Sequence, residues 1–331
     1  MGDIIAPEGS PLSVAVIGVA DMAASLHFYR DLIGLTAQDK VTWSGPAFET
    51  LWHLPEGSRA DAVFCELPGY PVGRVLLLDF DAVQREKIRG DETARAYGLV
   101  NLNFYTNDIV ADTKKFQSHG YRFWSEPTGY EMSEKAGAPI EVIFDGPDTV
   151  SINFVELATT DPTTRVGQMR AYADKHGRTP TGFTPVVTTS HCVRDIDKAT
   201  AFYKTVLKSG VLIDEIMDLE EQNHFLRLAK GSKTAVRFIQ GNDMFGKVAL
   251  SMPVNYECDD LVPRAHAPNI GYIAQMFEVS DLDYADQAST EVGAERYAPR
   301  DTYEIPGLGS VEALTVRNPG SGALQVIFEQ R

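Results

Sequence analysis

The sequence predicts an α+β fold built from four βαβββ modules, because one strand–helix unit recurs along the chain. Residues 188–207 begin as a short strand and continue as a helix whose apolar residues return at the 3.6-residue period. Asp195 precedes this helix, where its carboxylate can accept hydrogen bonds from the first free backbone amides. Residues 14–35 repeat the unit, with Asp21 before the helix and the same Phe-Tyr pair within it. The recurrence indicates a tandem duplication.

The duplication extends along the chain at a nearly constant offset. LPEGS from Leu54 matches LAKGS from Leu228, 174 residues later, and GRVLLLDF from Gly73 matches GKVALSMP from Gly246, 173 residues later. The matches continue in order to residues 145–147 and 317–319, at an offset of 172. Each half also contains a second strand–helix unit. The sequence therefore predicts modules at 12–82, 98–158, 184–256 and 269–330.

These modules are expected to form two domains, a first one at 1–160 and a second one at 182–331. Residues 161–181 are the expected linker. Helix-forming residues at 162–176, followed by glycine and proline, predict a linker helix and a loop. A shorter linker helix is expected at 83–97, between the first two modules.

Composition argues against several classes of function. The net charge of −16 and the pI near 4.8 argue against a nucleic-acid partner, because phosphates require clustered Lys and Arg. No stretch is apolar enough to span a bilayer, and the amino terminus lacks the pattern of a secretion signal. Cys65, Cys192 and Cys258 have no metal-like spacing and suit a reducing compartment. We expect a cytoplasmic protein without nucleic-acid or membrane partners, and the sequence is compatible with a homodimer.

The four modules resemble the vicinal oxygen chelate superfamily, which includes glyoxalases, extradiol dioxygenases and bleomycin resistance proteins. The resemblance rests on the βαβββ units, the Phe-Tyr pair on the first and third helices, and late turns at 145–148 and 318–320. It implies that paired modules curl into two open, barrel-like cups, each enclosing a small-molecule cavity.

The resemblance also implies where a metal would bind. In metal-dependent members, a histidine lies seven residues before the strand-ending aspartate and a glutamate lies on the last strand. Here those positions hold Val14, Asn101, Thr188 and Ala274, with Asn153 and Gln325 on the last strands. Amides and hydroxyls are weak ligands for Fe²⁺ or Zn²⁺. We therefore expect no cofactor, and a dioxygenase with non-standard metal ligands is an alternative.

Strand alternation predicts the cup lining of the second module. The expected cup face carries Asn101, Asn103, Tyr105, Ser151, Asn153 and Val155, and the opposite face is apolar. Five of these six residues can form hydrogen bonds, which favours an aromatic or oxygen-rich small-molecule ligand. The alternative is a buried hydrogen-bond network that only stabilises the fold.

The third and fourth modules are expected to line the other cup. Burial there would raise the proton affinity of Glu278 into the range of a general base, and a salt bridge to Arg227 or Arg237 is the alternative. His191 has the opposite parity and is expected to be a core histidine beneath a helix. The binding candidates in this cup are Thr188, Ser190, Cys192, Gln325, Arg227 and Arg237, with His224 and the two arginines expected on middle strands.

Two long loops are predicted to act as lids over the cups. They span residues 127–139 and 299–309, and each carries a Tyr-Glu pair, at Tyr130 and at Tyr303. His266 lies between two prolines and is a further polar candidate. Tyr303 and His266 are the expected general acids beside Glu278.

The sequence favours an enzyme of small-molecule catabolism, of the lyase, isomerase or ring-cleaving type, without a metal and with its base in the carboxyl-terminal cup. The alternative is a non-catalytic protein that sequesters a small molecule, as resistance proteins of the superfamily do. Asn101, Asn103 and Tyr105 correspond to Ala274, Met276 and Glu278 in the second half. This divergence favours the enzyme, because a binder could keep two similar cups.

Overall fold

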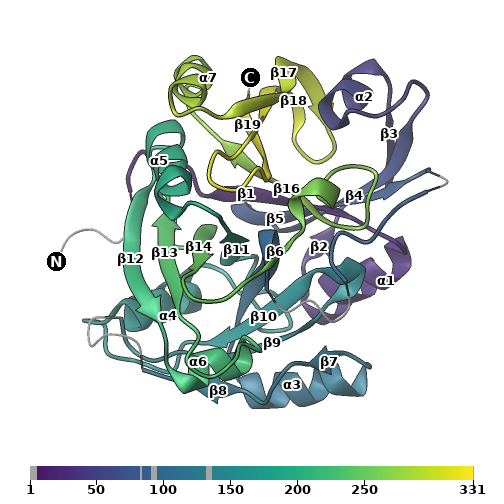
Figure 1. Cartoon of the computed structure of the whole chain (residues 1–331). Helices are drawn as coiled ribbons and strands as arrows, with labels where there is room; N and C mark the ends of the chain where they lie inside the picture. Colours follow the sequence, from purple (N-terminus) through teal and green to yellow (C-terminus); the bar gives the residue numbers. More distant parts are fainter. Residues whose placement is uncertain (1–5, 83, 91–94, 132–135, 331) are drawn as a thin grey trace.

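The structure, a computed structural model, describes residues 6–82, 84–90, 95–131 and 136–330 and confirms an α+β fold of four modules (Figure 1). The first module contains β1 (Leu12–Gly18), α1 (Met22–Leu26), η1 (His27–Leu32), β2 (Thr36–Ala37), β3 (Val41–Ser44), α2 (Pro46–Trp52), β4 (Arg59–Leu67) and β5 (Tyr70–Phe80). The second contains β6 (Ala96–Thr106), α3 (Ile109–Ser118), β7 (Arg122–Phe123), β8 (Thr128–Gly129), β9 (Ile140–Asp145), η2 (Pro147–Thr149) and β10 (Ser151–Glu156).

The second half repeats this order after the linker helix α4 (Arg165–His176). The third module contains β11 (Thr188–Cys192), α5 (Ile196–Val206), β12 (Gly210–Met217), α6 (Glu220–Phe225), β13 (Thr234–Gln240) and β14 (Lys247–Pro253). After β15 (Asp259–Asp260) and η3 (Val262–Arg264), the fourth contains β16 (Gly271–Glu278), α7 (Leu282–Glu291), β17 (Glu295–Ile305), β18 (Gly309–Arg317) and β19 (Leu324–Gln330).

The linker helix lies where the sequence predicts it, but the shorter linker helix does not form as expected. Residues 84–90 contain no helix, and Ala96 and Tyr97 already belong to β6. The rest of that prediction, at 83 and 91–94, lies outside the described residues.

An aspartate caps the first helix of every module. The side chains of Asp21, Asp108, Asp195 and Asp281 accept hydrogen bonds from backbone amides two or three residues further on, at 2.8–3.2 Å. Each cap satisfies amides that have no partner within the helix and contributes about 1 kcal/mol. These caps confirm the predicted strand–aspartate–helix units.

The modules do not pair as the sequence order suggested. β1 of the first module pairs antiparallel with β16 of the fourth, and β6 of the second pairs antiparallel with β11 of the third. Figure 1 shows β1 and β16 side by side, although they come from opposite ends of the chain. One sheet runs β17-β18-β19-β16-β1-β5-β4-β2, and the other runs β12-β13-β14-β11-β6-β10-β9-β7.

The expected cups within residues 1–160 and 182–331 are therefore wrong as pairs of modules. The first strand of each module has one edge without a strand partner inside the module, and the first strand of any other module could pair with that edge. We call the sheet of the first and fourth modules the outer cup and the sheet of the second and third modules the inner cup.

Two repeated glycines hold the cups together in equivalent ways. Gly73 has φ +72°, and its carbonyl accepts a hydrogen bond from Val186 N at 3.0 Å. Gly246 has φ +68°, and its carbonyl accepts one from Leu12 N at 2.8 Å. A Cβ at Gly73 would lie 2.2 Å from Val186 O, so a side chain would separate the sheets.

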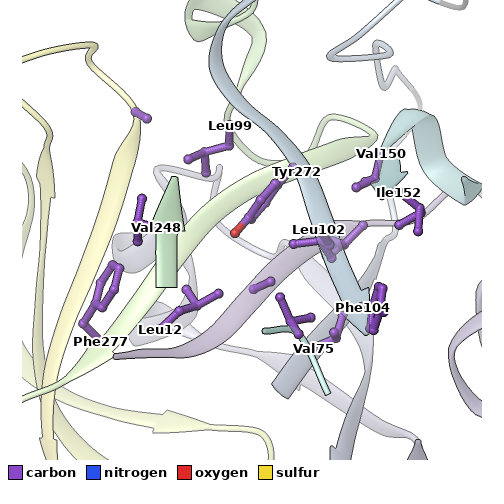
Figure 2. Close-up of a cluster of buried hydrophobic side chains, with 14 of the residues drawn as sticks. Leu12, Val75, Leu99, Leu102, Phe104, Val150, Ile152, Val248, Tyr272 and Phe277 are labelled. Carbon is purple, nitrogen blue, oxygen red and sulfur yellow. The ribbon is translucent and has the colours of Figure 1, made fainter. Parts of the chain in front are cut away.

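The main core lies between the backs of the two sheets. Figure 2 shows part of it, with side chains from β1, β5, β6, β10, β14 and β16 gathered in one cluster. Leu102, Phe104 and Ile152, which the sequence places away from the cup face, are fully buried there. Each such side chain contributes about 1.5–3 kcal/mol by burial. The apolar backs of the sheets thus explain why the two cups face away from each other.

The outer cup is filled with apolar side chains. Val14, Val16, Ala274 and Met276 point into it from the two central strands and are fully buried. α2 inserts Phe48, Leu51 and Trp52 against them. This cup serves as a second hydrophobic core.

Candidate functional site

The inner cup keeps a polar cavity of about 70 Å³. Its polar wall comes from the second module and β11, and its apolar wall comes mainly from β13 and α6. The lining residues are Arg95, Asn101, Asn103, Tyr130, Glu141, Ile143, Asn153, Ser190, Met217, Phe225, Leu226, Val236, Phe238, Ala249 and Ser251. Larger hollows of about 500 and 570 Å³ lie on the surface, but neither is lined by the polar face of a cup.

The two cups differ because equivalent helices carry different side chains. α2 begins at Pro46 and α6 begins at Glu220, which is 174 residues later and so matches the repeat. α2 fills the outer cup with Trp52, whereas α6 presents the smaller Leu226 at the equivalent position. The inner cup consequently retains a cavity beneath α6.

Glu141 on β9 is the carboxylate of this cavity. Its Oε1 accepts a hydrogen bond from the Tyr130 hydroxyl at 2.5 Å, and its Oε2 accepts one from Asn153 Nδ2 at 2.5 Å. Burial raises the pKa of Glu141, although both hydrogen bonds and the nearby charge of Arg95 act in the opposite direction. A carboxylate with raised proton affinity at a cavity wall is suited to act as a general base.

Three asparagines line the same wall. Asn101 Nδ2 donates to Asn103 Oδ1 on β6, and Asn153 lies beside Asn103 on the parallel strand β10. Asn153 Oδ1 is buried and has no hydrogen-bond partner among the described residues. A buried acceptor without a donor costs about 1–3 kcal/mol, so a ligand hydroxyl would stabilise it.

Arg95 is the cation of the cavity. It lies one residue before β6 and is half buried, and its Nε is buried without a hydrogen-bond partner among the described residues. No ion pair within 4.0 Å joins it to a described carboxylate, although it is near enough to Glu141 to lower the pKa of that group.

α6 covers the cavity as a lid. Phe225 stacks on Tyr130 with ring centroids 5.6 Å apart and an interplanar angle of 12°. At the surface, His224 Nε2 lies 3.2 Å from Glu126 Oε2, and the Arg227 guanidinium lies 5.1 Å from the Trp124 ring centroid. These contacts join the lid to the second module.

Three expected binding residues, Tyr105, Thr188 and Cys192, do not line the cavity. Tyr105 lies deeper, where its hydroxyl donates to Met169 Sδ of α4 at 3.2 Å. Thr188 pairs with Asn103 and is buried next to Lys247 on β14. Cys192 is buried beside the Cys258 thiol, and this contact lowers the pKa of Cys192. Ser190 is the expected β11 residue that lines the cavity.

The expected catalytic residues do not meet. Glu278 lies at the end of β16 on a surface hollow with Lys208 and Asn242, and its backbone amide donates to Ser13 Oγ at 3.2 Å. Tyr303 belongs to β17, not to a lid loop, and its buried hydroxyl donates to Pro299 O at 2.8 Å. His266 Nδ1 contacts Ala267 O at 2.7 Å in the segment before β16. Most of the segment 299–309, which was predicted to be a loop because of its length, is part of β17, because it pairs with β18 as a hairpin.

Three other expectations need correction. Gln325 lies on the back of the outer sheet, where its Oε1 is 3.5 Å from the Tyr203 hydroxyl, because β19 pairs with β16 one residue out of the expected parity. Arg237 points away from the cup and pairs with Asp197 and Asp214. His224 is on α6 and Arg227 follows it, so neither is on a strand.

The predicted lid at 127–139 includes β8 and Tyr130, and its residues 132–135 lie outside the described residues.

His191 is the core histidine that the sequence predicts. It is fully buried, with Nδ1 at 3.0 Å from the Tyr203 hydroxyl of α5 and Nε2 at 2.6 Å from Ser321 Oγ. Burial lowers its pKa to about 3, so the ring is neutral at physiological pH.

Comparisons with known proteins show a family match over part of the chain and a shared fold over nearly all of it. Residues 12–154 match the Glyoxalase/Bleomycin resistance protein/Dioxygenase superfamily. Glyoxalase I from Zea mays is similar over 97% of this chain and 92% of that chain, with 14% identity and a TM-score of 0.60. A putative dioxygenase from Bacillus subtilis is similar over 98% of this chain and 86% of that chain, with 12% identity and a TM-score of 0.59. No curated protein sequence matches the chain.

The family match covers residues 12–154, and the described chain as a whole has a glyoxalase-like fold. The inner cup does not offer the ligands that metal-dependent members use. Its expected metal positions hold Asn101, Asn153 and Thr188, and Glu141 is the only carboxylate among the described lining residues. No cluster of three His, Cys, Asp or Glu side chains with metal-binding geometry occurs in the described part of the chain. No described helix is long and apolar enough to span a membrane.

Sequence reasoning missed Glu141 and Arg95. Glu141 and the terminal Asp145 are the only charged residues of β9, so Glu141 stands out among apolar neighbours, but the face of a middle strand cannot be assigned from alternation alone. Nothing in the sequence around Arg95 marks it as a cavity residue, because its place in the cavity depends on the path of the chain into β6.

Proposed function

We propose that the inner cup is the active site of an enzyme that transfers protons on a small molecule, of the lyase or isomerase type, with Glu141 as the general base. The observation that carries this proposal is the Glu141 carboxylate at the cavity wall, oriented by Tyr130 and Asn153, with its pKa raised by burial. A base in this environment takes a proton more readily than a solvated carboxylate.

Glu141 keeps free acceptor positions for a substrate proton in spite of its two hydrogen bonds. A carboxylate has about four acceptor positions, and Tyr130 and Asn153 occupy one on each oxygen. The remaining lone pairs can accept a proton from a carbon or hydroxyl of the substrate. Asn101, Asn103 and Ser190 supply amides and a hydroxyl that bind substrate oxygens, and no step requires a metal ligand that the cup lacks.

Substrate entry requires the lid to move. The cavity of about 70 Å³ is smaller than the roughly 300–1,000 Å³ of ordinary ligand sites. α6 is a six-residue helix held by side-chain contacts, so displacing Phe225 from Tyr130 would enlarge the cup.

Proton exchange tests the proposal even while the natural substrate is unidentified. A panel of small ketones, hydroxy acids and their esters is incubated with the protein in D₂O, and loss of C–H signals is followed by NMR. We expect exchange of at least one compound, a decrease of roughly a hundredfold or more in Glu141→Gln, and an unchanged rate in Glu278→Gln. Exchange that survives Glu141→Gln but is lost in Glu278→Gln would assign the reaction to the outer sheet. Binding without exchange would favour the sequestration alternative.

A further inference from the structure

The state of Arg95 indicates what kind of molecule the inner cup accepts. Several arginines of low exposure in the described chain have carboxylate partners: Arg89 with Asp145 at 2.8 Å, Arg178 with Asp174 at 2.9 Å, and Arg237 with Asp197 at 2.6 Å. Arg74 is buried without a carboxylate within 4.0 Å among the described residues, but it does not line the inner cavity. Arg95 has no such partner within 4.0 Å among the described residues, and its Nε is buried without an acceptor. The described residues therefore leave a positive charge and at least one N–H donor without a partner at the cavity wall.

Glu141 does not neutralise the positive charge of Arg95. Burial favours its protonated form, and its two oxygens already accept hydrogen bonds from Tyr130 and Asn153. The Arg95 guanidinium is half buried and lacks an anionic partner among the described residues, so an anionic ligand would gain more here than at the exposed surface. The net charge of −16 repels anions at long range, which makes a specific local cation necessary for such a ligand.

The rest of the cavity narrows the choice of anion. Phe225, Phe238 and Ile143 form an apolar wall, and Asn153 Oδ1 is an acceptor that lacks a donor among the described residues. A guanidinium binds a planar carboxylate through two parallel N–H···O bonds. A singly charged carboxylate fits a cavity with one cation better than a doubly charged phosphate does.

We propose that the inner cup binds a small hydroxycarboxylic acid, with the carboxylate on Arg95, the hydroxyl donating to Asn153 Oδ1 and the carbon skeleton against Phe225 and Phe238. This assignment rests on the proposed function and adds the substrate class. When its carboxylate is bound to Arg95, the acid has the neighbouring carbon or hydroxyl within reach of Glu141, because Arg95 and Glu141 line the same cavity.

Matched pairs of carboxylates and neutral amides test this proposal. Binding of lactate, lactamide, benzoate and benzamide is measured by isothermal titration calorimetry at low ionic strength. We expect at least one carboxylate to bind about tenfold or more tightly than its amide. Lactate and benzoate separate the hydroxyl contact from the apolar contact. Equal binding of acid and amide, or no binding of either acid, would overturn the proposal.

Variants assign the effect to Arg95. Arg95→Gln should weaken carboxylate binding about tenfold or more and leave amide binding unchanged, and Arg95→Lys should give an intermediate loss. Arg59→Gln, which removes an exposed partner of Asp81 in the other sheet, is the matched control and should bind as the wild type does. A loss of equal size in Arg59→Gln, or none in Arg95→Gln, would contradict the assignment.

Glu141→Gln separates this inference from the proposed function. Carboxylate affinity should be retained in this variant, because Gln keeps the shape of the side chain and Arg95 is unchanged, while proton exchange is lost. Carboxylate binding without exchange in the wild type would reject the enzyme and keep the ligand class. Exchange of neutral compounds only would reject the ligand class and keep the enzyme.

Discussion

Asn153 on β10 donates its Nδ2 hydrogen to Glu141 Oε2 on β9 at 2.5 Å, and its own Oδ1 has no partner among the described residues. One amide thus orients the carboxylate of the cavity and leaves an acceptor beside it. The contact is made across the antiparallel pair of β9 and β10, in which Val155 lies opposite Glu141 and Asn153 lies opposite Ile143. Asn153 is therefore the diagonal neighbour of Glu141, within reach of a side-chain hydrogen bond.

The pH dependence of stability should identify Glu141 as a buried carboxyl. Its folded pKa is raised above the unfolded value near 4.5, so its contribution to stability is complete below that value and is lost as pH rises through the folded pKa. Glu141→Gln should therefore increase the free energy of unfolding at pH 7–8 and have little effect below pH 4. Urea unfolding at both pH values measures this, with the exposed Glu304→Gln as the control. A destabilised variant at pH 8 would show that the charge is stabilised in the fold.

His191 should make the protein sensitive to acid. Its pKa is lowered from 6.5 to about 3, so the unfolded chain binds the proton first, and stability falls as pH falls below 6.5. At pH 5 this loss amounts to roughly 2 kcal/mol. His191→Gln should lose less stability than the wild type between pH 7.5 and 5, as measured by urea unfolding. The exposed His119→Gln is the control, and identical pH profiles for wild type and His191→Gln would contradict the prediction.

Lys247 should be replaceable with a gain in stability. It is buried near the Tyr105 ring, and burial lowers its pKa to about 7, so protonated Lys247 destabilises the folded chain at and below that pH. Lys247→Met should stabilise the protein by on the order of 2 kcal/mol at pH 6, after loss of its hydrogen bond to Met244 O. The gain should shrink as pH rises from 7 towards 10.5. Thermal unfolding across this range checks it, with the exposed Lys233→Met as the reference.

The lid should depend on Phe225. Phe225→Ala removes the stacking on Tyr130 and most of the apolar anchor of α6, a loss of about 3–5 kcal/mol. We expect faster hydrogen exchange in residues 220–226 and a faster rate of ligand entry. Leu51→Ala is the matched control, since Leu51 lies at the equivalent position of α2 in the outer cup. It should lower global stability without changing exchange in α6, and protected α6 amides in Phe225→Ala would argue against a lid.

Local patterns in the sequence were sufficient for the modules and their caps. Asp21, Asp108, Asp195 and Asp281 act within three residues of their own positions, and period-two alternation placed Asn101, Asn103 and Asn153 on one face. His191 was assigned to the core by the same alternation. These features depend on neighbours in the chain, which is why they can be read without a structure.

Only the tertiary structure decided which modules join and which cup stays open. β1 pairs with β16 and β6 pairs with β11 through contacts between distant segments, and every first strand presented a similar open edge. The same long-range packing fills the outer cup with Trp52, moves Glu278 to a surface hollow, and brings Arg95 and Glu141 to one cavity. The modules were thus determined by local periodicity, whereas the candidate site depends on pairing energies that no single module contains.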